Sequence, residues 1–147
     1  MAHSFSRNHI HLVFSTKERR NLIPSDKKQQ LWAYAAGICK SYELGPIAIG
    51  GTENHAHLLF HLPPKIALAK AVQVLKANSS KWMGESGIRF AWQDGYAAFS
   101  VSSSSLDQVA RYIRNQEMHH RKLTFEDEFQ TLLRKHGLEY DSKFVLG

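Results

Sequence analysis

Two segments of the chain are nearly the same: NHIHLVF at residues 8–14 and NHAHLLF at residues 54–60. Each has two histidines one residue apart, followed by an apolar run. Runs of about 4–8 apolar and β-branched residues are typical of strands, so residues 9–16 and 55–62 are predicted to be strands. Side chains at positions i and i+2 of a strand point to the same face, so the two histidines of each pair project together.

The other elements are predicted from apolar periodicity and turn residues. Helices are expected at about residues 25–41, 66–83, 106–121 and 124–136, with further strands at 47–52 and within 88–101. This order predicts one α+β domain over residues 1–147, a ferredoxin-like or RRM-like sandwich whose mostly antiparallel sheet packs against helices. Within it, residues 102–121 form a polar serine linker and the third helix, and residues 122–147 form the C-terminal helix and tail.

The composition limits the classes of protein that this chain can belong to. The 147 residues are 43% hydrophobic, enough for a core, and 19 basic against 13 acidic residues give a net charge of +6. This charge fits either an ordinary surface or a polyanion partner such as nucleic acid. The single cysteine, Cys39, excludes an internal disulfide framework and a cysteine-based zinc site. With no membrane-length apolar run and no signal segment, a cytoplasmic protein without a membrane partner is expected.

Each histidine pair is a candidate for metal binding, because neutral imidazole is a common ligand. A pair supplies only two ligands, so a third must come from elsewhere, and ordinary surface or core histidines are the alternative. The second pair, His55 and His57, is the better candidate. It lies in mid-chain, in a strand expected to be central, and a central strand is the more rigid platform for a site.

The third predicted helix, SSLDQVARYIRNQEMHHR at residues 104–121, carries a possible nucleophile. Ser105 followed by Gln108 resembles a capping box. Tyr112 and Gln116 are four residues apart, so they lie one above the other on a flank of the apolar stripe. A tyrosine hydroxyl has a pKa near about 10 and needs a metal, a base or a favourable field to react. The alternative is that Tyr112 borders the core and Gln116 is solvated.

Together these motifs resemble a known family. His55-Ala56-His57 resembles the histidine-hydrophobic-histidine (HUH) motif, and RYIRNQE resembles the tyrosine helix of the single-tyrosine HUH transposases. The segments HLVFSTKERR, VQVLKANSSKWM and WQDGYAAFSVS are also similar to that family. The resemblance covers nearly the whole chain. The length of 147 residues suits the compact transposases of the smallest single-strand insertion sequences, and their repeat-associated relatives are similar.

The resemblance implies a reaction and a set of site residues. Tyr112 would attack a phosphodiester of single-stranded DNA, release a 3′-OH and become joined to the 5′-phosphate, while His55, His57 and Gln116 hold Mg²⁺ or Mn²⁺. It also implies recognition of hairpin DNA near element ends, a homodimer and no small-molecule substrate. Whether the tyrosine helix docks on its own chain or on the partner is left open.

Cations are needed for the DNA phosphates. Lys17, Arg19 and Arg20 in one turn are the best candidates, followed by Lys76 and Lys81 on the second helix. For each of them, the alternative is an ordinary solvated charge.

Other residues keep two interpretations. His11 could support the metal site or contact DNA, although a structural role is favoured, and a metal site built from His9 and His11 is the least favoured version. Trp82, Trp92 and Tyr96 could stack on bases or belong to the core. Two other functions compete with the transposase: a catalytically idle hairpin-binding protein of the same fold, and a replication-initiation or relaxase-type HUH nuclease.

Overall fold

The computed structural model describes residues 5–139. Its four strands form one sheet in the order β2-β3-β1-β4, and every neighbouring pair is antiparallel. The strands are β1 (His9–Ser15), β2 (Gly45–Thr52), β3 (His55–His61) and β4 (Ala97–Val101). This arrangement confirms the predicted α+β fold with an antiparallel sheet.

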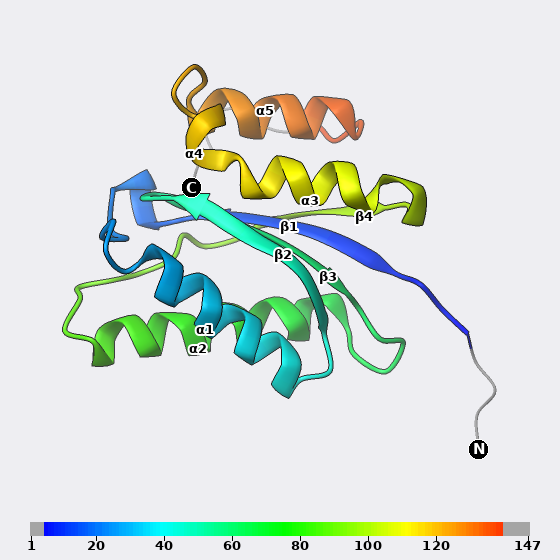
Figure 1. Ribbon diagram of the computed structural model, residues 1–147, viewed down its shortest axis with the longest axis horizontal. Coiled ribbons are helices and arrows are strands. Elements are labelled where there is room, and N and C mark those ends of the chain that lie inside the picture. The colour runs from blue at the N-terminus through cyan, green and yellow to red at the C-terminus, as the bar shows by residue number, and fades with distance from the viewer. Residues whose placement is uncertain (1–4, 140–147) are drawn as a thin grey trace.

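Helices cover both faces of the sheet (Figure 1). One face packs against α1 (Lys28–Ser41) and α2 (Leu68–Glu85). The other lies beneath α3 (Leu106–Arg114), α4 (Gln116–His119) and α5 (Phe125–Lys135). Short 3-10 turns are formed by η1 (Lys17–Arg19) and η2 (Ser103–Ser105). None of the helices among residues 5–139 is both long enough and apolar enough to cross a membrane.

The two histidine-containing segments are the central strands β3 and β1, paired with each other. Leu12 and Phe14 of β1, with Leu58 and Phe60 of β3, belong to the core beneath α1 and α2. The alternate positions point to the opposite face, because successive strand residues point in opposite directions. The apolar letters of the repeated motif thus build one core, while its histidines face α3, α4 and α5.

Some predicted boundaries were wrong. The first helix begins at Lys28 rather than Ser25, because the Lys27 N–H donates to the Pro24 carbonyl in a turn, at 2.9 Å. One or two strands were expected within residues 88–101, and β4 is the one that the structure forms there, while Trp92 makes an isolated bridge with Thr16.

The predicted third helix is broken in two. Asn115 separates α3 from α4 and has φ −99° and ψ 21°, outside the range of a regular helix. Ser105 makes no side-chain capping bond, so the predicted capping box is wrong. Gln116, the first residue of α4, is buried rather than solvated on a helix flank.

A glycine in β2 allows α3 to approach the sheet closely. A Cβ atom added at Gly50 would lie 2.6 Å from the backbone carbonyl oxygen of Ile113, in the turn of α3 that follows Tyr112. The tyrosine helix therefore rests on the backbone of β2, with no side chain between them.

We expect Gly50→Ala to lower the free energy of unfolding by about 1–3 kcal/mol, because the new methyl group has to push α3 away from β2. The measurement is urea denaturation followed by circular dichroism. Gly84→Ala in α2 is the matched control: nothing lies within 4 Å of its added Cβ, so this change should be neutral or stabilising. Equal effects of the two changes would contradict the close packing.

Candidate active site

His55 and His57 are fully buried on the sheet face covered by α3, α4 and α5. His55 Nδ1 lies 2.8 Å from Asn54 Oδ1 and 3.0 Å from Thr52 Oγ1. An amide oxygen only accepts, so His55 carries its hydrogen on Nδ1 and keeps a lone pair on Nε2. Burial and the nearby His57 lower the pKa of His55 to about 3, so the ring is neutral.

The lone pair of His55 has no donor among its nearest partners. Nε2 lies 2.9 Å from Gln116 Oε1, and an amide oxygen cannot donate. The Gln116 amide is oriented by its Nε2 group, which donates to Glu128 Oε2 at 3.0 Å. The His55 Nε2 lone pair and the Gln116 oxygen are thus two acceptors that face each other in a buried site. A bound cation would accept electron density from both, so these residues fit a metal ion.

Both ring nitrogens of His57 contact other buried side chains. Its Nε2 lies 3.0 Å from Glu128 Oε1, and its Nδ1 lies 2.8 Å from His11 Nε2. Facing a carboxylate, Nε2 carries the hydrogen, and Nδ1 then accepts from His11. Burial and His57 keep the pKa of His11 well below its usual value, so His11 is neutral and able to hold either tautomer of His57. The structure therefore gives His11 a supporting role beside His57, whereas the sequence favoured a purely structural one.

Glu128 of α5 is the central residue that sequence analysis missed. Burial alone would raise the pKa of its carboxyl group, but hydrogen bonds from His120 and His57 outweigh burial and hold the pKa well below the usual range. The carboxylate is therefore ionised although only 2% of Glu128 is exposed. One oxygen contacts His57 and His120, and the other accepts from Tyr112 and Gln116.

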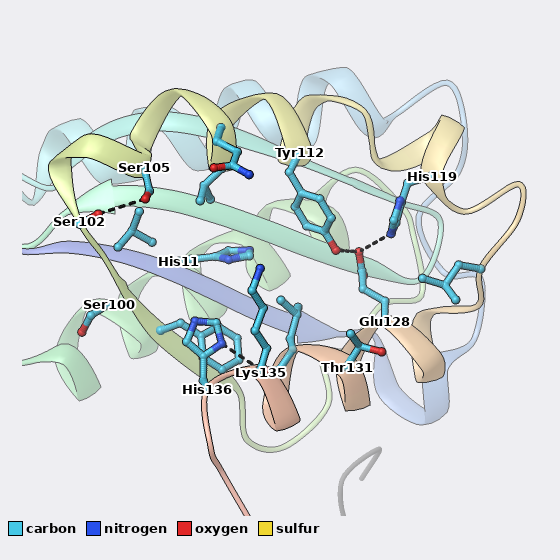
Figure 2. A pocket seen from close by; sticks show the side chains of 16 residues that line it. His11, Ser100, Ser102, Ser105, Tyr112, His119, Glu128, Thr131, Lys135 and His136 are labelled. Carbon is cyan, nitrogen blue, oxygen red and sulfur yellow. Dashed lines mark hydrogen bonds and ion pairs between the residues drawn. The ribbon is translucent and has the colours of Figure 1, made fainter.

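Tyr112 points from α3 toward this carboxylate (Figure 2). Its hydroxyl donates to Glu128 Oε2, and its ring lies edge-on to His57 with centroids 5.7 Å apart. Burial and the charge of Glu128 raise the pKa of Tyr112 far above its usual value. The hydroxyl is therefore protonated at neutral pH.

His120, for which the sequence offered no role, completes the cluster. Its Nδ1 faces the Leu123 carbonyl at 2.7 Å, and its Nε2 faces Glu128 Oε1 at 3.0 Å and Gln116 Oε1 at 3.1 Å. All three partners are acceptors, so both ring nitrogens carry hydrogen. Burial would lower the pKa of His120, but Glu128 and the Leu123 carbonyl raise it. An imidazolium next to the carboxylate thus partly compensates the buried charge.

The ligand atoms of His55, His57 and Glu128 lie within 4.8 Å of one another and could hold a metal ion. Gln116, the third ligand expected from sequence, contacts both His55 and Glu128. Two imidazole nitrogens with amide and carboxylate oxygens form a mixed donor set that suits several divalent cations. Among residues 5–139, the candidate group of three metal ligands includes neither His9 nor His11.

The structure places the predicted DNA-contacting residues outside this cluster. Lys17 is exposed on η1, Arg19 pairs with Glu126 at 2.7 Å and Arg20 pairs with Glu18 at 2.6 Å. Their roles on DNA stay predictions.

Lys76 and Lys81 of α2 differ in their contacts with the rest of the protein. The Lys76 ammonium donates to the carbonyls of Gln93 and Gly95 at 2.6 and 2.9 Å, so in this conformation it is engaged with the protein. Lys81 is exposed, 4.0 Å from Glu85. Contact with DNA stays a prediction for both.

The three residues proposed to stack on bases differ in their exposure and packing. Trp82 stacks on Tyr34 with centroids 5.0 Å apart, and Trp92 packs edge-on against Phe14, so both border the core. Tyr96 is 41% exposed.

One signal in the sequence could have identified Glu128. Phe125, Phe129 and Leu133 form the apolar stripe of α5, and position 128 lies on that same stripe. Of the three acidic residues in the EDE segment, Glu128 alone is buried. An acid at a core position of an amphipathic helix needs partners, and a nearby histidine pair could supply them.

We expect Glu128→Gln to weaken Mn²⁺ binding by at least about 10–100-fold, because an anionic ligand becomes neutral. Isothermal titration calorimetry with the purified protein measures this change. Asp127→Asn, at the exposed neighbouring position, should bind Mn²⁺ as the unchanged protein does. Equal affinity in all three proteins would show that the carboxylate is not a ligand.

Metal-free protein should lose stability as the pH falls from about 6.5 to 5. The pKa of His55 is about 3 in the folded protein and near 6.5 when unfolded, so the unfolded chain binds more protons in this window. His55 alone should cost about 1.5 kcal/mol of unfolding free energy over the window. Urea denaturation with a chelator at several pH values measures the slope, and His55→Gln should flatten it. An unchanged slope in the variant would assign the pH dependence to other groups.

Comparison with known proteins connects this cluster to a family. The family described as "Transposase IS200 like" matches residues 4–116, a span that includes both site histidines, Tyr112 and Gln116 and ends before Glu128. The transposase for insertion sequence element IS200 of Salmonella typhimurium is 23% identical over 124 residues, covering 79% of this chain and 81% of its own length. The IS200 transposase of Salmonella typhi matches equally.

Two solved structures share the fold. One, described as a transposase from Deinococcus radiodurans R1, has a TM-score of 0.64 and 22% identity, covering 79% of this chain and 95% of that one. The other, a REP-associated tyrosine transposase bound to a REP hairpin, has a TM-score of 0.61 and 13% identity, covering 82% and 73%. With a family match that spans most of its length, the chain belongs to the IS200-like transposase family.

Proposed function

We propose that this protein cleaves and rejoins single-stranded DNA with Tyr112 as the nucleophile. The observation that carries the proposal is the shared carboxylate: Glu128 contacts both the Tyr112 hydroxyl and the His57 nitrogen that would bind a metal. The candidate nucleophile and the candidate metal ligands therefore meet at one point of a single chain.

In the proposed reaction, the Tyr112 oxygen forms a bond to the phosphorus and the bond from phosphorus to the 3′-oxygen breaks. The products are a 5′-phosphotyrosine and a free 3′-OH, and the reverse attack by a 3′-OH rejoins the strand. Glu128 Oε2 is the nearest acceptor for the tyrosine proton, which ends on the departing 3′-oxygen. Because the bond energy stays in the phosphotyrosine, rejoining needs no other energy source.

The metal ligands proposed here are His55, His57 and Gln116, with Glu128 as an additional ligand. A divalent cation such as Mg²⁺ or Mn²⁺ would polarise the scissile phosphate and neutralise its developing charge. Asn54 and His11 hold the two imidazoles in place from their outer nitrogens. Lys28 pairs with Glu117 and Glu53, and so fixes α4, which carries Gln116.

The proposed substrate is hairpin or single-stranded DNA. A relative with this fold was solved bound to a REP hairpin, and the net charge of +6 favours a polyanion. Lys17, Arg19 and Arg20 of η1 are proposed to contact the phosphates. A homodimer is proposed from the family resemblance, although Tyr112 already reaches the histidines of its own chain.

The test is covalent capture on a pool of random single-stranded hairpins with Mn²⁺, followed by denaturation and sequencing of protein-linked DNA. We expect adducts with a shared sequence at their 5′ ends, and at least about a 1,000-fold loss of adduct with Tyr112→Phe, because the attacking oxygen is gone. Hairpin retention before denaturation should be nearly unchanged in that variant.

Tyr96→Phe, which removes the hydroxyl of an exposed tyrosine and keeps its ring, is the matched control and should form adducts normally. Full adduct yield from Tyr112→Phe would contradict the assignment of the nucleophile. Hairpin retention without any adduct would favour the idle binding protein.

A further inference from the structure

An open cavity of about 580 Å³ adjoins the active site, between β4, α3 and α5. Tyr112 and Glu128 form part of its wall, so the cavity begins where the proposed reaction takes place (Figure 2). Its volume is within the range of about 300–1,000 Å³ typical of small-ligand sites. The catalytic proposal uses only this edge and leaves the rest of the cavity without a role.

The floor of the cavity is apolar and partly flat. Phe99 comes from β4, Val109 from α3 and Leu132 from α5. The ring of His136 stacks on Phe99, with centroids 4.2 Å apart and 23° between the planes. Such a surface suits a planar aromatic group, because stacking is sequence-tolerant and favourable for any base.

The rim is polar and carries positive charge. Lys135 extends into the cavity from the last turn of α5, and His119 stands beside Tyr112 (Figure 2). Glu128 is the one acidic residue among the described residues that line the cavity, and its carboxylate is already occupied by hydrogen bonds. Ser102 and Gln108 add hydrogen-bonding groups to the lining.

We propose that this cavity holds one unpaired nucleotide of the DNA strand, next to the phosphate that Tyr112 attacks. The base lies against the Phe99–His136 pair, and its phosphate faces Lys135. A base inside a duplex cannot enter such a cavity, so the site selects single-stranded DNA or a base flipped out of the stack. The position of the nucleotide relative to the attacked phosphate rests on the proposed function, whereas nucleotide binding itself does not.

Nucleotide binding can be tested without any reaction. The metal-free protein is titrated separately with dAMP, dCMP, dGMP and TMP, and the imidazole carbon-bound proton signals of His136 are followed by NMR. We expect at least one nucleotide to give saturable shifts, and Lys135→Ala to weaken its binding about tenfold, because a charge-assisted contact to phosphate is lost.

The control uses a neighbouring residue. Arg134→Ala removes the same charge from the same turn of α5 but does not line the cavity, so binding should be unchanged. The proposal is overturned if none of the four nucleotides gives saturable shifts at millimolar concentration, or if Lys135→Ala and Arg134→Ala behave alike.

A second measurement tests whether occupancy of the cavity affects the rate of DNA cleavage. Once covalent capture has identified the cleaved phosphate, the base on its 5′ or 3′ side is removed in turn. We expect one of these abasic strands to form the adduct about tenfold more slowly, because base stacking is lost. Val109→Trp, which fills the cavity, should slow cleavage of the intact strand by a similar factor and cancel the sensitivity to the missing base.

Thermal melting of Val109→Trp checks that this variant is folded. Full-rate cleavage of both abasic strands overturns the placement next to the attacked phosphate. If no strand forms an adduct at all, the proposed function fails, and the nucleotide titration still decides whether the cavity is a nucleotide site.

Discussion

The structure depends on the antiparallel pairing of β1 with β3 at the centre of the sheet. This pairing buries two strands on both faces, so every second residue points to one helical layer and the rest to the other. Leu12 and Leu58 enter the core beneath α1 and α2, while His11 and His57 emerge on the same opposite face and contact each other. A shift of one residue in the register would exchange the two sets and abolish both the core and the site.

The second constraint is the ionised carboxylate of Glu128 in the interior. An isolated buried charge is costly, so the groups that surround it must donate hydrogen bonds or carry positive charge. Donors come from β3, α3, α4 and the residue that follows α4: these are His57, Tyr112, Gln116 and His120. Burying Glu128 therefore requires the tyrosine helix and the histidine strand to meet, which is also the geometry that the proposed chemistry needs.

The same arrangement bears on the proposed reaction of Tyr112. Burial and the charge of Glu128 raise the pKa of Tyr112, and the lone pair of His55 faces an amide oxygen instead of a donor. A cation would relieve both conditions at once, because it would neutralise the carboxylate and accept the imidazole lone pair. The adjoining cavity places the proposed nucleotide beside Tyr112, so the metal ligands and the DNA strand would converge on the same hydroxyl.

The sequence by itself determined the order of the elements and the α+β class, because strand alternation and apolar periodicity depend only on neighbouring residues. Four proposed site residues, His55, His57, Tyr112 and Gln116, came from the resemblance of short motifs to a known family. Only the tertiary structure decided that Glu128 joins this group, that His11 supports His57, that His120 contacts Glu128, and that Lys76 is engaged by backbone carbonyls. Each of these depends on contacts between elements far apart in the chain, such as β3 with α5, and a local pattern carries no information on which distant group a side chain will meet.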